Sequence, residues 1–329
     1  MTICASRIQR TLNAAHADHA ANTTGANADY IPSLSTVDPN LFGIAVVTVA
    51  GEVIEAGDSR HEFALESISK VFTLALAMED VGPQVIRAKV GADPTGLPFG
   101  SVMALELHGD KPLTPLVNAG ALSTTSLVRA STPSQRWQRI LKTQRAFAGR
   151  DISLSKEVDA SEQSTNFHNR AIAWLLYSAG AMYADPMETC EVYTRQCSTM
   201  VTTTDLAVMG ATLAAGGTNP VTGHRVIRDT YIPRILAEMT MEGLYDTSGD
   251  WAYTVGLPGK SGVGGGLLAV APGRLAIAAF SPPLDPVGNS VRGCAAIAQI
   301  AHDLGLNLYQ SPTPVRTSQA APAPPGSST

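Results

Sequence analysis

The sequence has no long uninterrupted apolar run. Its apolar stretch LLAVAPGRLAIAAF, residues 267–280, is broken by Pro272, Gly273 and Arg274, so neither half reaches the length that a membrane-spanning helix needs. The N-terminal stretch MTICASRIQRTLNAAHADHAANTTGANADY lacks the apolar core of a secretory signal. We therefore expect a cytoplasmic protein with no membrane span.

Charged residues are also scarce, at 16% of 329 residues, whereas 44% are hydrophobic. The net charge of −5 is not gathered into an acidic or basic block, which argues against nucleic acid or a charged membrane surface as the partner. The charge pattern leaves small neutral or zwitterionic molecules as candidate ligands. The composition is typical of a globular protein with one large domain or two closely packed ones.

Cysteine is limited to four residues, Cys4, Cys190, Cys197 and Cys294, and none forms a C-x-x-C pair. Cys190 and Cys197 are spaced to lie two turns apart on one helix, too far for a disulfide and poorly placed for zinc. His168 has no second histidine or cysteine at ligand spacing, which favours a structural hydrogen bond. We expect free thiols and no metal site.

Strand patterns stand near both ends of the chain, with helix patterns between them. Residues 41–58 predict a β-hairpin, and residues 250–258, 265–272 and 274–283 predict further strands. Helix-period apolar residues fill the region from about 67 to 245, and residues 289–306 predict a closing helix. In the region between, the predicted helices cover residues 71–82, 133–149, 168–183, 186–200 and 204–217. The pattern predicts an α+β fold with an antiparallel sheet built from both chain ends.

Two terminal segments differ from the rest in composition. The leader before the hairpin is polar, and we expect His16 and His19 in it to lie on a solvated face. Residues 310–329 are rich in Pro, Ala, Ser and Thr and almost free of charge, which predicts a disordered tail. The predicted folded domain is therefore residues 1–309.

Ser67 and Lys70 in FALESISK are the first catalytic candidates. Three positions apart on a helix, their side chains share one face, so Lys70 could take the Ser67 proton. A buried helix N-terminus at this point would favour developing negative charge and desolvate the lysine. A second copy of the pattern, Ser153 and Lys156, lies among acidic residues where a lysine stays solvated. The pattern alone is equally compatible with a helix N-cap and a surface lysine.

The glycine-rich stretch GKSGVGGG, residues 259–266, is the second candidate. A P-loop needs a glycine five positions before Gly259, where this chain has Thr254, and a strand-like segment follows where a dinucleotide motif needs a helix. Lys260, Ser261 and Gly262 resemble the Lys-Thr-Gly strand of penicillin-recognising serine enzymes. A purely structural glycine bulge is the alternative.

Isolated polar residues within apolar helical segments form the third group. Asn118, Glu162, Asn169 and Tyr245 offer the amide, carboxylate and phenol groups that hold the ammonium, carboxylate and side-chain amide of an amino acid. Each taken alone is more typical of a helix cap or a loop than of a binding site.

Taken together, these motifs closely resemble the bacterial-type glutaminase family, which shares a serine β-lactamase-like fold. The resemblance covers about residues 28–306 and rests on the stretches ADYIPSL, FALESISKV, GADPTGLPF, PLVNAGA, SEQSTNFHNRAIAWLLYSAG, VYTRQCS, LAAGGTNP, MEGLYDTSGDWAYTVGLPGKSGVGGG and AAFSPPLD. It implies hydrolysis of L-glutamine to L-glutamate and ammonia, with no metal or organic cofactor. It also implies a homo-oligomer, either a dimer or a tetramer.

The resemblance also implies roles for single residues. Ser67 is implied as the nucleophile and Lys70 as its base, with the main-chain N–H groups of Ser67 and Val263 holding the oxyanion. Glu162 is implied as the counter-charge of the substrate's α-ammonium. The other implied site residues are Asn118, Asn169, Tyr193 and Tyr245 as substrate contacts, Tyr245 also as a proton relay, Tyr30 at the site entrance and Lys260 as the second lysine of the fold.

Rival functions remain as alternatives. A penicillin-recognising hydrolase or peptidase of the same fold is disfavoured by the missing export signal and the lack of a Ser-x-Asn element. Another cytoplasmic amidohydrolase of the same fold stays open. A non-catalytic amino-acid-binding protein is disfavoured because Ser67 and Lys70 are both intact.

Overall fold

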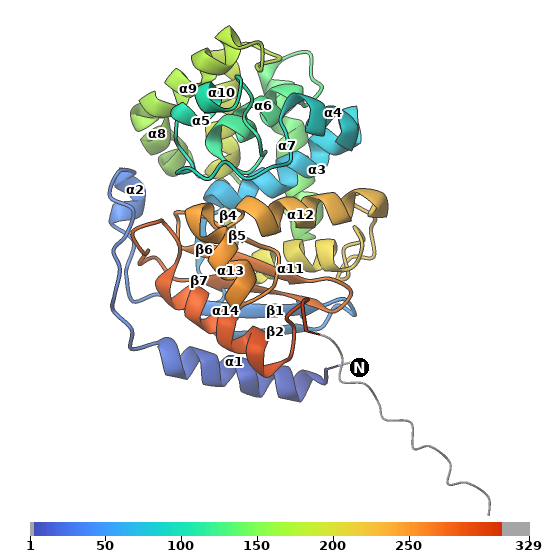
Figure 1. The fold of residues 1–329 in the computed structure, drawn as a ribbon. Helices are drawn as coiled ribbons and strands as arrows, with labels where there is room; N and C mark the ends of the chain where they lie inside the picture. Colours follow the sequence, from blue (N-terminus) through green and yellow to red (C-terminus); the bar gives the residue numbers. More distant parts are fainter. Residues whose placement is uncertain (1–2, 311–329) are drawn as a thin grey trace, which may run out of the picture.

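The structure is a computed structural model, and it describes residues 3–310. Five antiparallel strands form the main sheet in the order β2-β1-β7-β6-β5 (Figure 1). The order pairs strands from opposite ends of the chain, with Ala45 of β1 opposite Ala278 of β7. The strands span β1 Gly43–Thr48, β2 Val53–Gly57, β5 Gly259–Ser261, β6 Gly266–Ala271 and β7 Leu275–Phe280. The predicted α+β architecture, a serine β-lactamase-like fold, is confirmed. The predicted tail falls almost entirely outside the described residues.

The central strands β1, β6 and β7 are buried along their whole length. Helices cover both faces of the sheet, so these strands need apolar side chains on both sides rather than an apolar–polar alternation. Their sequences GIAVVT, GLLAVA and LAIAAF meet that need. Helix α11, Thr203–Ala214, covers one face, and α1, Ala5–His19, and α14, Val291–Asp303, cover the other (Figure 1).

The N-terminal leader is an amphipathic helix rather than a solvated segment. Ile8, Leu12 and Ala15 of α1 are buried against the sheet layer. Nε2 of His16 lies 3.1 Å from the Phe42 carbonyl oxygen, and Nε2 of His19 lies 2.8 Å from Oε1 of a glutamine on α14. The prediction of a solvated face for these two histidines is wrong, because three apolar residues at helical spacing are enough to dock this helix against the sheet layer.

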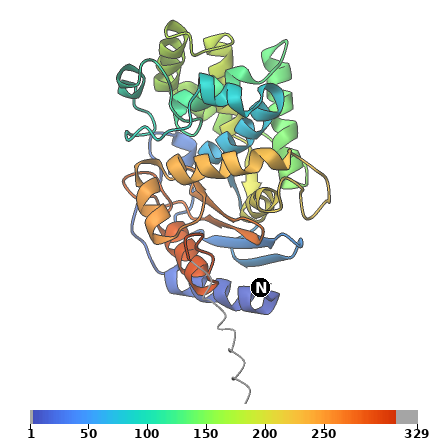
Figure 2. The same ribbon diagram turned by 45° about the vertical axis from the view of Figure 1, so that its right-hand side comes forward.

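The region between the hairpin and the C-terminal strands is helical, as predicted, and forms the upper part of the molecule (Figures 1 and 2). A two-stranded sheet of β3, Glu62–Ala64, and β4, Met200–Thr202, joins the start of this region to its end. Its helices are α3 Ser69–Val81, α4 Pro83–Lys89, α5 Met103–Leu107, α6 Asn118–Leu127, α7 Pro133–Ala148, α8 Lys156–Thr165, α9 Phe167–Ser178 and α10 Pro186–Cys197. The remaining short elements are α2 Pro32–Ser35, η1 Glu66–Ile68, η2 Asp229–Tyr231, α12 Ile232–Glu242, η3 Tyr245–Thr247 and α13 Ser248–Thr254.

Residues 250–258 were predicted as a strand, and that prediction is wrong. The segment DWAYT belongs to helix α13, Ser248–Thr254. Its Trp251 is buried and donates from Nε1 to the Leu257 carbonyl oxygen at 2.8 Å, which satisfies the indole within the turn that follows the helix. Aromatic and β-branched residues favour strands only weakly, and here the packing of one indole against the sheet layer outweighs that preference.

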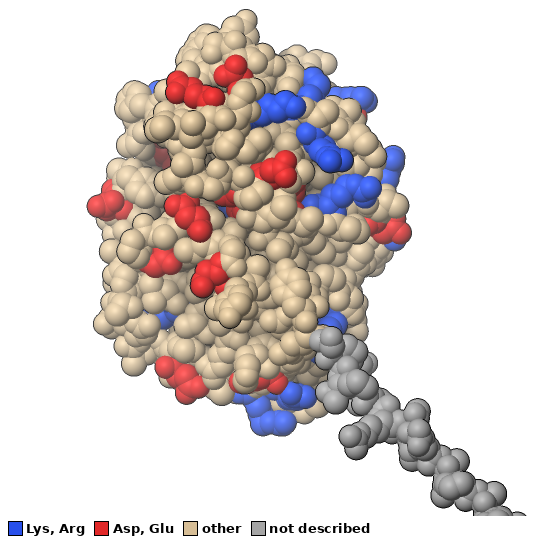
Figure 3. Space-filling view, in the orientation of Figure 1, with Lys and Arg blue, Asp and Glu red and all other residues tan. Residues whose placement is uncertain are grey.

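The surface carries charges of both signs. On the face shown in Figure 3, acidic residues are spread from the top of the molecule to the bottom, and most lysines and arginines gather at the upper right. Large areas between them are uncharged, which agrees with the low charge content. Among residues 3–310, no helix is both long enough and apolar enough to cross a membrane.

The end of β7 provides a test of the core. Phe280 is fully buried, and its ring stacks on that of Phe63 with centroids 4.2 Å apart. We expect Phe280→Ala to lower the free energy of unfolding by about 3–5 kcal/mol, because it removes a buried ring and leaves a cavity. Urea denaturation measures the change. Tyr253→Ala is the control, since Tyr253 is 89% exposed, and a loss as small in Phe280→Ala as in this control would contradict the packing.

Candidate active site

The candidate site lies where the edge strand β5 meets the start of the helical region. Ser67 sits in the short 3₁₀ turn η1, which leads directly into the core helix α3. The preceding residue, Glu66, has a left-handed backbone conformation with φ of 50°. Such a conformation is unusual for a residue with a side chain and occurs often at functional sites. Ser67 itself is buried.

Lys70 lies one turn further along and faces Ser67. Its Nζ donates a hydrogen bond to the Ser67 Oγ at 2.5 Å, and both side chains are buried. Burial lowers the pKa of Lys70, while the nearby Cys197 and the carboxylates of Glu66 and Glu162 act in the opposite direction. The structure therefore brings Ser67 and Lys70 together in a buried setting, and burial favours the neutral amine form of Lys70.

The second Ser-x-x-Lys copy has none of these features. Ser153 and Lys156 are both exposed, and Lys156 opens helix α8 at the surface. This contrast agrees with the sequence interpretation of the two copies.

The glycine-rich turn after β5 packs directly against the segment that carries Ser67. A Cβ atom added to Gly262 would lie 3.0 Å from the Leu65 carbonyl oxygen, and one added to Gly264 would lie 2.8 Å from the Ala64 carbonyl oxygen. The N–H of Val263, between these glycines, donates to no protein acceptor within residues 3–310. An unpaired N–H in a turn that packs against the segment carrying a serine nucleophile is suited to holding an oxyanion.

Lys260 of β5 is fully buried and points toward the same region. Its Nζ donates to the carbonyl oxygens of Gly243, at 3.1 Å, and Ser261, at 2.8 Å, and lies 4.7 Å from the centre of the Tyr245 ring. Burial, and then the charge of Lys70, holds the pKa of Lys260 well below its ordinary value. Lys260 therefore lies against the Tyr245 ring and holds the neighbouring backbone by its two hydrogen bonds.

Tyr245 begins the 3₁₀ turn η3 and has a left-handed φ of 54°. Its hydroxyl donates to the Ser261 carbonyl oxygen at 3.2 Å, and its ring packs against Phe99 with centroids 4.8 Å apart. Burial raises the pKa of the Tyr245 phenol, and the neighbouring Ser67 hydroxyl partly opposes this effect. The phenol therefore keeps its proton at neutral pH and can donate it.

Three polar residues from three helices form a chain of hydrogen bonds. The Tyr193 hydroxyl of α10 donates to Asn118 Oδ1 of α6 at 3.1 Å, and Asn118 Nδ2 donates to Asn169 Oδ1 of α9 at 2.9 Å. Among residues 3–310, no acceptor is paired with Asn169 Nδ2, so this chain ends in free donor groups. The Lys70 Nζ lies 5.3 Å from the centre of the Tyr193 ring, which connects the chain to the Ser67 pair.

Glu162 of α8 is buried and accepts a hydrogen bond from the Ser198 hydroxyl at 3.2 Å. Ligand atoms of Glu162, Glu66 and Cys197 all lie within 4.8 Å of one another. Burial and the charge of Glu66 raise the pKa of Glu162, and burial raises that of the Cys197 thiol.

Glu66 and Cys197 are the site residues that sequence reasoning missed. Glu66 directly precedes the nucleophile candidate, and a carboxylate within the apolar approach FALES is the one signal that could have revealed it. Cys197 could not be placed from the sequence, because its contact with Ser69, with Sγ 3.6 Å from the hydroxyl oxygen, joins two distant helices.

Two other predicted residues lie toward the surface. Tyr30 is 55% exposed and lines a cavity of about 640 Å³ together with Phe99 and Gly288, beside the ring of Tyr245. This position is compatible with a role at the site entrance. His168 is exposed, and its Nε2 lies 2.5 Å from the Gly100 carbonyl oxygen, which agrees with the structural hydrogen bond predicted for it.

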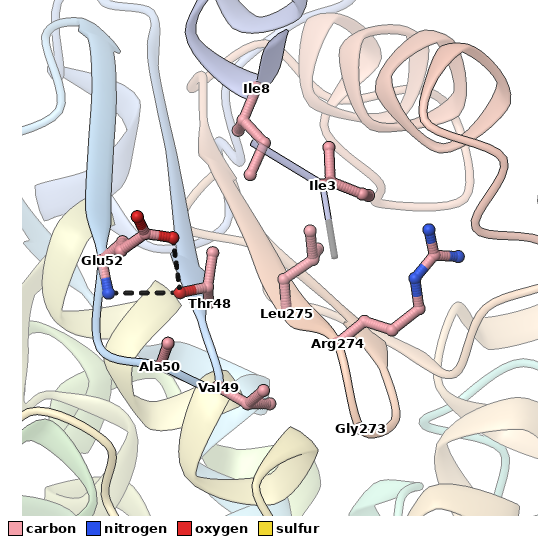
Figure 4. Close-up of a pocket in the computed structure, with 9 residues that line it drawn as sticks. All are labelled: Ile3, Ile8, Thr48, Val49, Ala50, Glu52, Gly273, Arg274 and Leu275. Atoms are coloured by element: carbon pink, nitrogen blue, oxygen red, sulfur yellow. Dashed lines mark hydrogen bonds between the residues drawn. The ribbon is translucent and has the colours of Figure 1, made fainter. Parts of the chain in front are cut away.

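A separate cavity of about 520 Å³ lies beside the two hairpin turns of the sheet (Figure 4). Ile3, Ile8 and Leu275 give it an apolar wall, and Glu52 hydrogen-bonds Thr48 at its rim. It contains none of the predicted site residues. Nothing in its lining resembles a nucleophile with a base, so the candidate active site stays at Ser67.

The chain is similar to known proteins in both sequence and structure. A family model described as Glutaminase matches residues 25–309. The glutaminase of Mycobacterium ulcerans (strain Agy99) is 66% identical over 307 residues, which cover 93% of this chain and 96% of the relative. The glutaminase of Desulfovibrio desulfuricans is 62% identical over 305 residues, which cover 93% of this chain and 98% of the relative. The solved structure of a probable glutaminase, ybaS, matches with a TM-score of 0.93 and 62% identity over 94% of this chain and 100% of its own. A probable glutaminase from Bacillus subtilis complexed with 6-diazo-5-oxo-L-norleucine matches with a TM-score of 0.82 and 30% identity over 93% of this chain and 97% of its own.

The electrostatics of the pair can be tested by titration. Because burial lowers the pKa of Lys70, its side chain should lose its proton at a lower pH than an unperturbed lysine, whose pKa is about 10.4. NMR of the Cε carbons in ¹³C-lysine-labelled protein measures the titration, with the Lys70 signal assigned by its loss in Lys70→Gln. Titration of Lys70 at the unperturbed pH would show that the site is open to water.

Proposed function

This chain belongs to the glutaminase family and is an amidohydrolase, and from that premise we propose that it hydrolyses L-glutamine through a covalent intermediate on Ser67. The products are L-glutamate and ammonia. The observation that carries the proposal is the hydrogen bond of 2.5 Å between Lys70 Nζ and Ser67 Oγ in a buried setting. A serine hydroxyl is a weak nucleophile until an adjacent base takes its proton.

In the first half of the reaction, the neutral amine of Lys70 takes the Ser67 proton as Oγ attacks the carboxamide carbon. The C=O electron pair moves onto oxygen and gives a tetrahedral oxyanion. Collapse of this intermediate breaks the C–N bond, and the leaving nitrogen takes a proton to depart as ammonia. Lys70 holds a proton for that step, and the protonated phenol of Tyr245 can relay it because it lies beside Ser67.

In the second half, water attacks the ester carbon and gives its proton to the base. The C–O bond to Ser67 then breaks, Oγ regains a proton and L-glutamate leaves. The N–H groups of Ser67 and Val263 would hold the oxyanion in both halves. The unpaired Val263 N–H supports that role.

The remaining polar groups fit the two ends of an amino acid. Glu162 supplies an anionic partner for the α-ammonium, and Asn118, Asn169 and Tyr193 supply N–H and O–H donors for the α-carboxylate and the carboxamide. The Bacillus subtilis neighbour is complexed with 6-diazo-5-oxo-L-norleucine, an amino acid with a reactive side chain. That ligand supports an amino-acid pocket in this chain. A homo-oligomeric state remains a prediction from the resemblance, and a cytoplasmic location remains a prediction from the N-terminal sequence, which lacks the apolar core of a secretory signal.

The first test is ammonia release from L-glutamine by the purified protein and by Ser67→Ala. We expect the substitution to lower kcat by at least about 10³-fold, because it removes the nucleophile, and to leave glutamine binding intact. Ser153→Ala is the matched control, because Ser153 belongs to the exposed copy of the same pattern. Equal losses in both variants, or ammonia release by Ser67→Ala at the wild-type rate, would refute the assignment. Nitrocefin turnover by wild-type protein comparable to glutamine hydrolysis would favour the penicillin-recognising alternative.

A second test addresses the glycine-rich turn. Gly264→Ala places a Cβ atom 2.8 Å from the Ala64 carbonyl oxygen and so pushes the Val263 N–H away from Ser67. We expect kcat to fall by about 10²–10³-fold, the loss typical of one oxyanion donor, with a smaller effect on KM. Gly249→Ala is the control, because its added Cβ atom would meet nothing within 4 Å. Full activity in Gly264→Ala would rule out Val263 as the donor.

A further inference from the structure

Glu66 is a buried carboxylate to which the mechanism above assigns no role. The residue is 3% exposed, and its Oε1 has no hydrogen-bond partner within residues 3–310. A buried ionised oxygen without a partner is strongly unfavourable, so it needs either a proton or a cation. Its side chain is fixed by close packing, since its Cβ and Cγ atoms lie against Gly262 and Gly264.

The group nearest to this carboxylate is a second carboxylate. Oxygen atoms of Glu66 and Glu162 lie within 4.8 Å of each other in the buried site, and only Glu162 has a hydroxyl donor, from Ser198. Two carboxylates this close in a buried site do not both ionise readily, and one proton held between them removes the repulsion. A bound ammonium group removes it equally well, because it brings one positive charge and three N–H donors.

We propose that Glu66 and Glu162 together bind the α-ammonium of the substrate, and that they share one proton until the ammonium displaces it. The inference rests on the proposed glutaminase site, and it adds Glu66 as a substrate-binding residue and a proton release to the binding step. When the site is empty, the pair consists of one carboxylic acid and one carboxylate. When the substrate binds, the acid O–H bond breaks, the proton passes to solvent, and both carboxylates accept hydrogen bonds from the ammonium.

Other titratable groups face the pair from each surrounding element, and their effects are compatible with this exchange. Burial lowers the pKa of Lys70, and the charges of Glu66 and Glu162 oppose that shift, while burial raises the pKa values of the phenols and the thiol. The groups concerned are Lys70 on α3, Asp159 on α8, Tyr193 and Cys197 on α10, Tyr245 on η3 and Tyr30 in the N-terminal loop. The phenols and the thiol keep their protons near neutral pH, so Lys70 and the carboxylate pair are the groups that can change charge there, and Glu66→Gln separates the proton of the pair from that of Lys70.

The direction of the pH dependence follows from the burial of the pair. Burial raises the pKa of Glu66 to about 7, and the pKa of Glu162 is raised well above its ordinary value. Below about pH 7 the empty pair holds its proton, and the ammonium must displace that proton to bind. Affinity for the amino acid should therefore weaken as the pH falls below about 7, by at most tenfold per pH unit for one proton.

Proton release can be measured on Ser67→Ala, in which glutamine binds without being hydrolysed. Calorimetric titration with L-glutamine at about pH 6.5, in two buffers that differ in ionisation enthalpy, should show a release of roughly half to one proton per site. Glutamine binding with the same heat in both buffers would overturn the inference and leave the proposed function standing. A folded Ser67→Ala protein with no glutamine binding at all would instead count against the proposed function.

A second variant assigns the proton to the pair. Glu66→Gln, added to Ser67→Ala, keeps the side-chain shape but removes one carboxylate, so the proton release should fall by at least half and the pH dependence of Kd should flatten. Glu62→Gln in the same background is the control, because Glu62 is exposed and pairs with Arg150 at 3.6 Å. Unchanged release in Glu66→Gln would place the proton on Glu162 alone and overturn the sharing. If Glu66→Gln does not fold, the pH dependence of Kd in Ser67→Ala still decides, since a flat profile between about pH 5.5 and 7 contradicts the inference.

Discussion

The structure depends on keeping ionisable side chains out of water where the sheet meets the helical region. Lys70, Lys260, Glu66 and Glu162 are all buried there. Desolvation is unfavourable for each one alone, and it shifts each toward its neutral form. The same shifts are what the reaction requires, since an amine base must be neutral. A site of this kind depends on a surrounding core that keeps bulk water away from these side chains while admitting the one water molecule that the proposed hydrolysis consumes.

That rigidity comes from close contact between two segments far apart in the chain. The turn at residues 262–265 packs against residues 64–68 so closely that side chains at Gly262 and Gly264 would collide with backbone atoms. The turn is held in place by β5 and β6 of the main sheet, and residues 64–68 by β3 and the core helix α3. The catalytic geometry is therefore set by the contact between sheet and helices and by neither part alone.

Much of this could be predicted from the sequence. The hairpin, the two C-terminal core strands and most of the larger helices carry strong periodic or continuous apolar patterns, and the resemblance located Ser67, Lys70 and the polar residues around them. Helix α13 could not be predicted, because its aromatic and β-branched residues favour a strand until Trp251 is packed. Helix α1 was not predicted from the sequence, because only Ile8, Leu12 and Ala15 form its buried face. A role for Glu66 could not be predicted from the sequence, because it depends on Glu162, which lies on another helix and comes close to Glu66 only in the fold.

The pairing of β1 with β7 also determines when activity can arise during synthesis. The β1–β2 hairpin leaves the ribosome early, but its partner strand and the turn bearing Val263 are made only after the whole helical region. Contacts this distant in sequence form late and slow folding. A nascent chain thus holds the Ser67 segment long before the turn bearing Val263 can pack against it, so the complete site forms only after the C-terminal strands have been made.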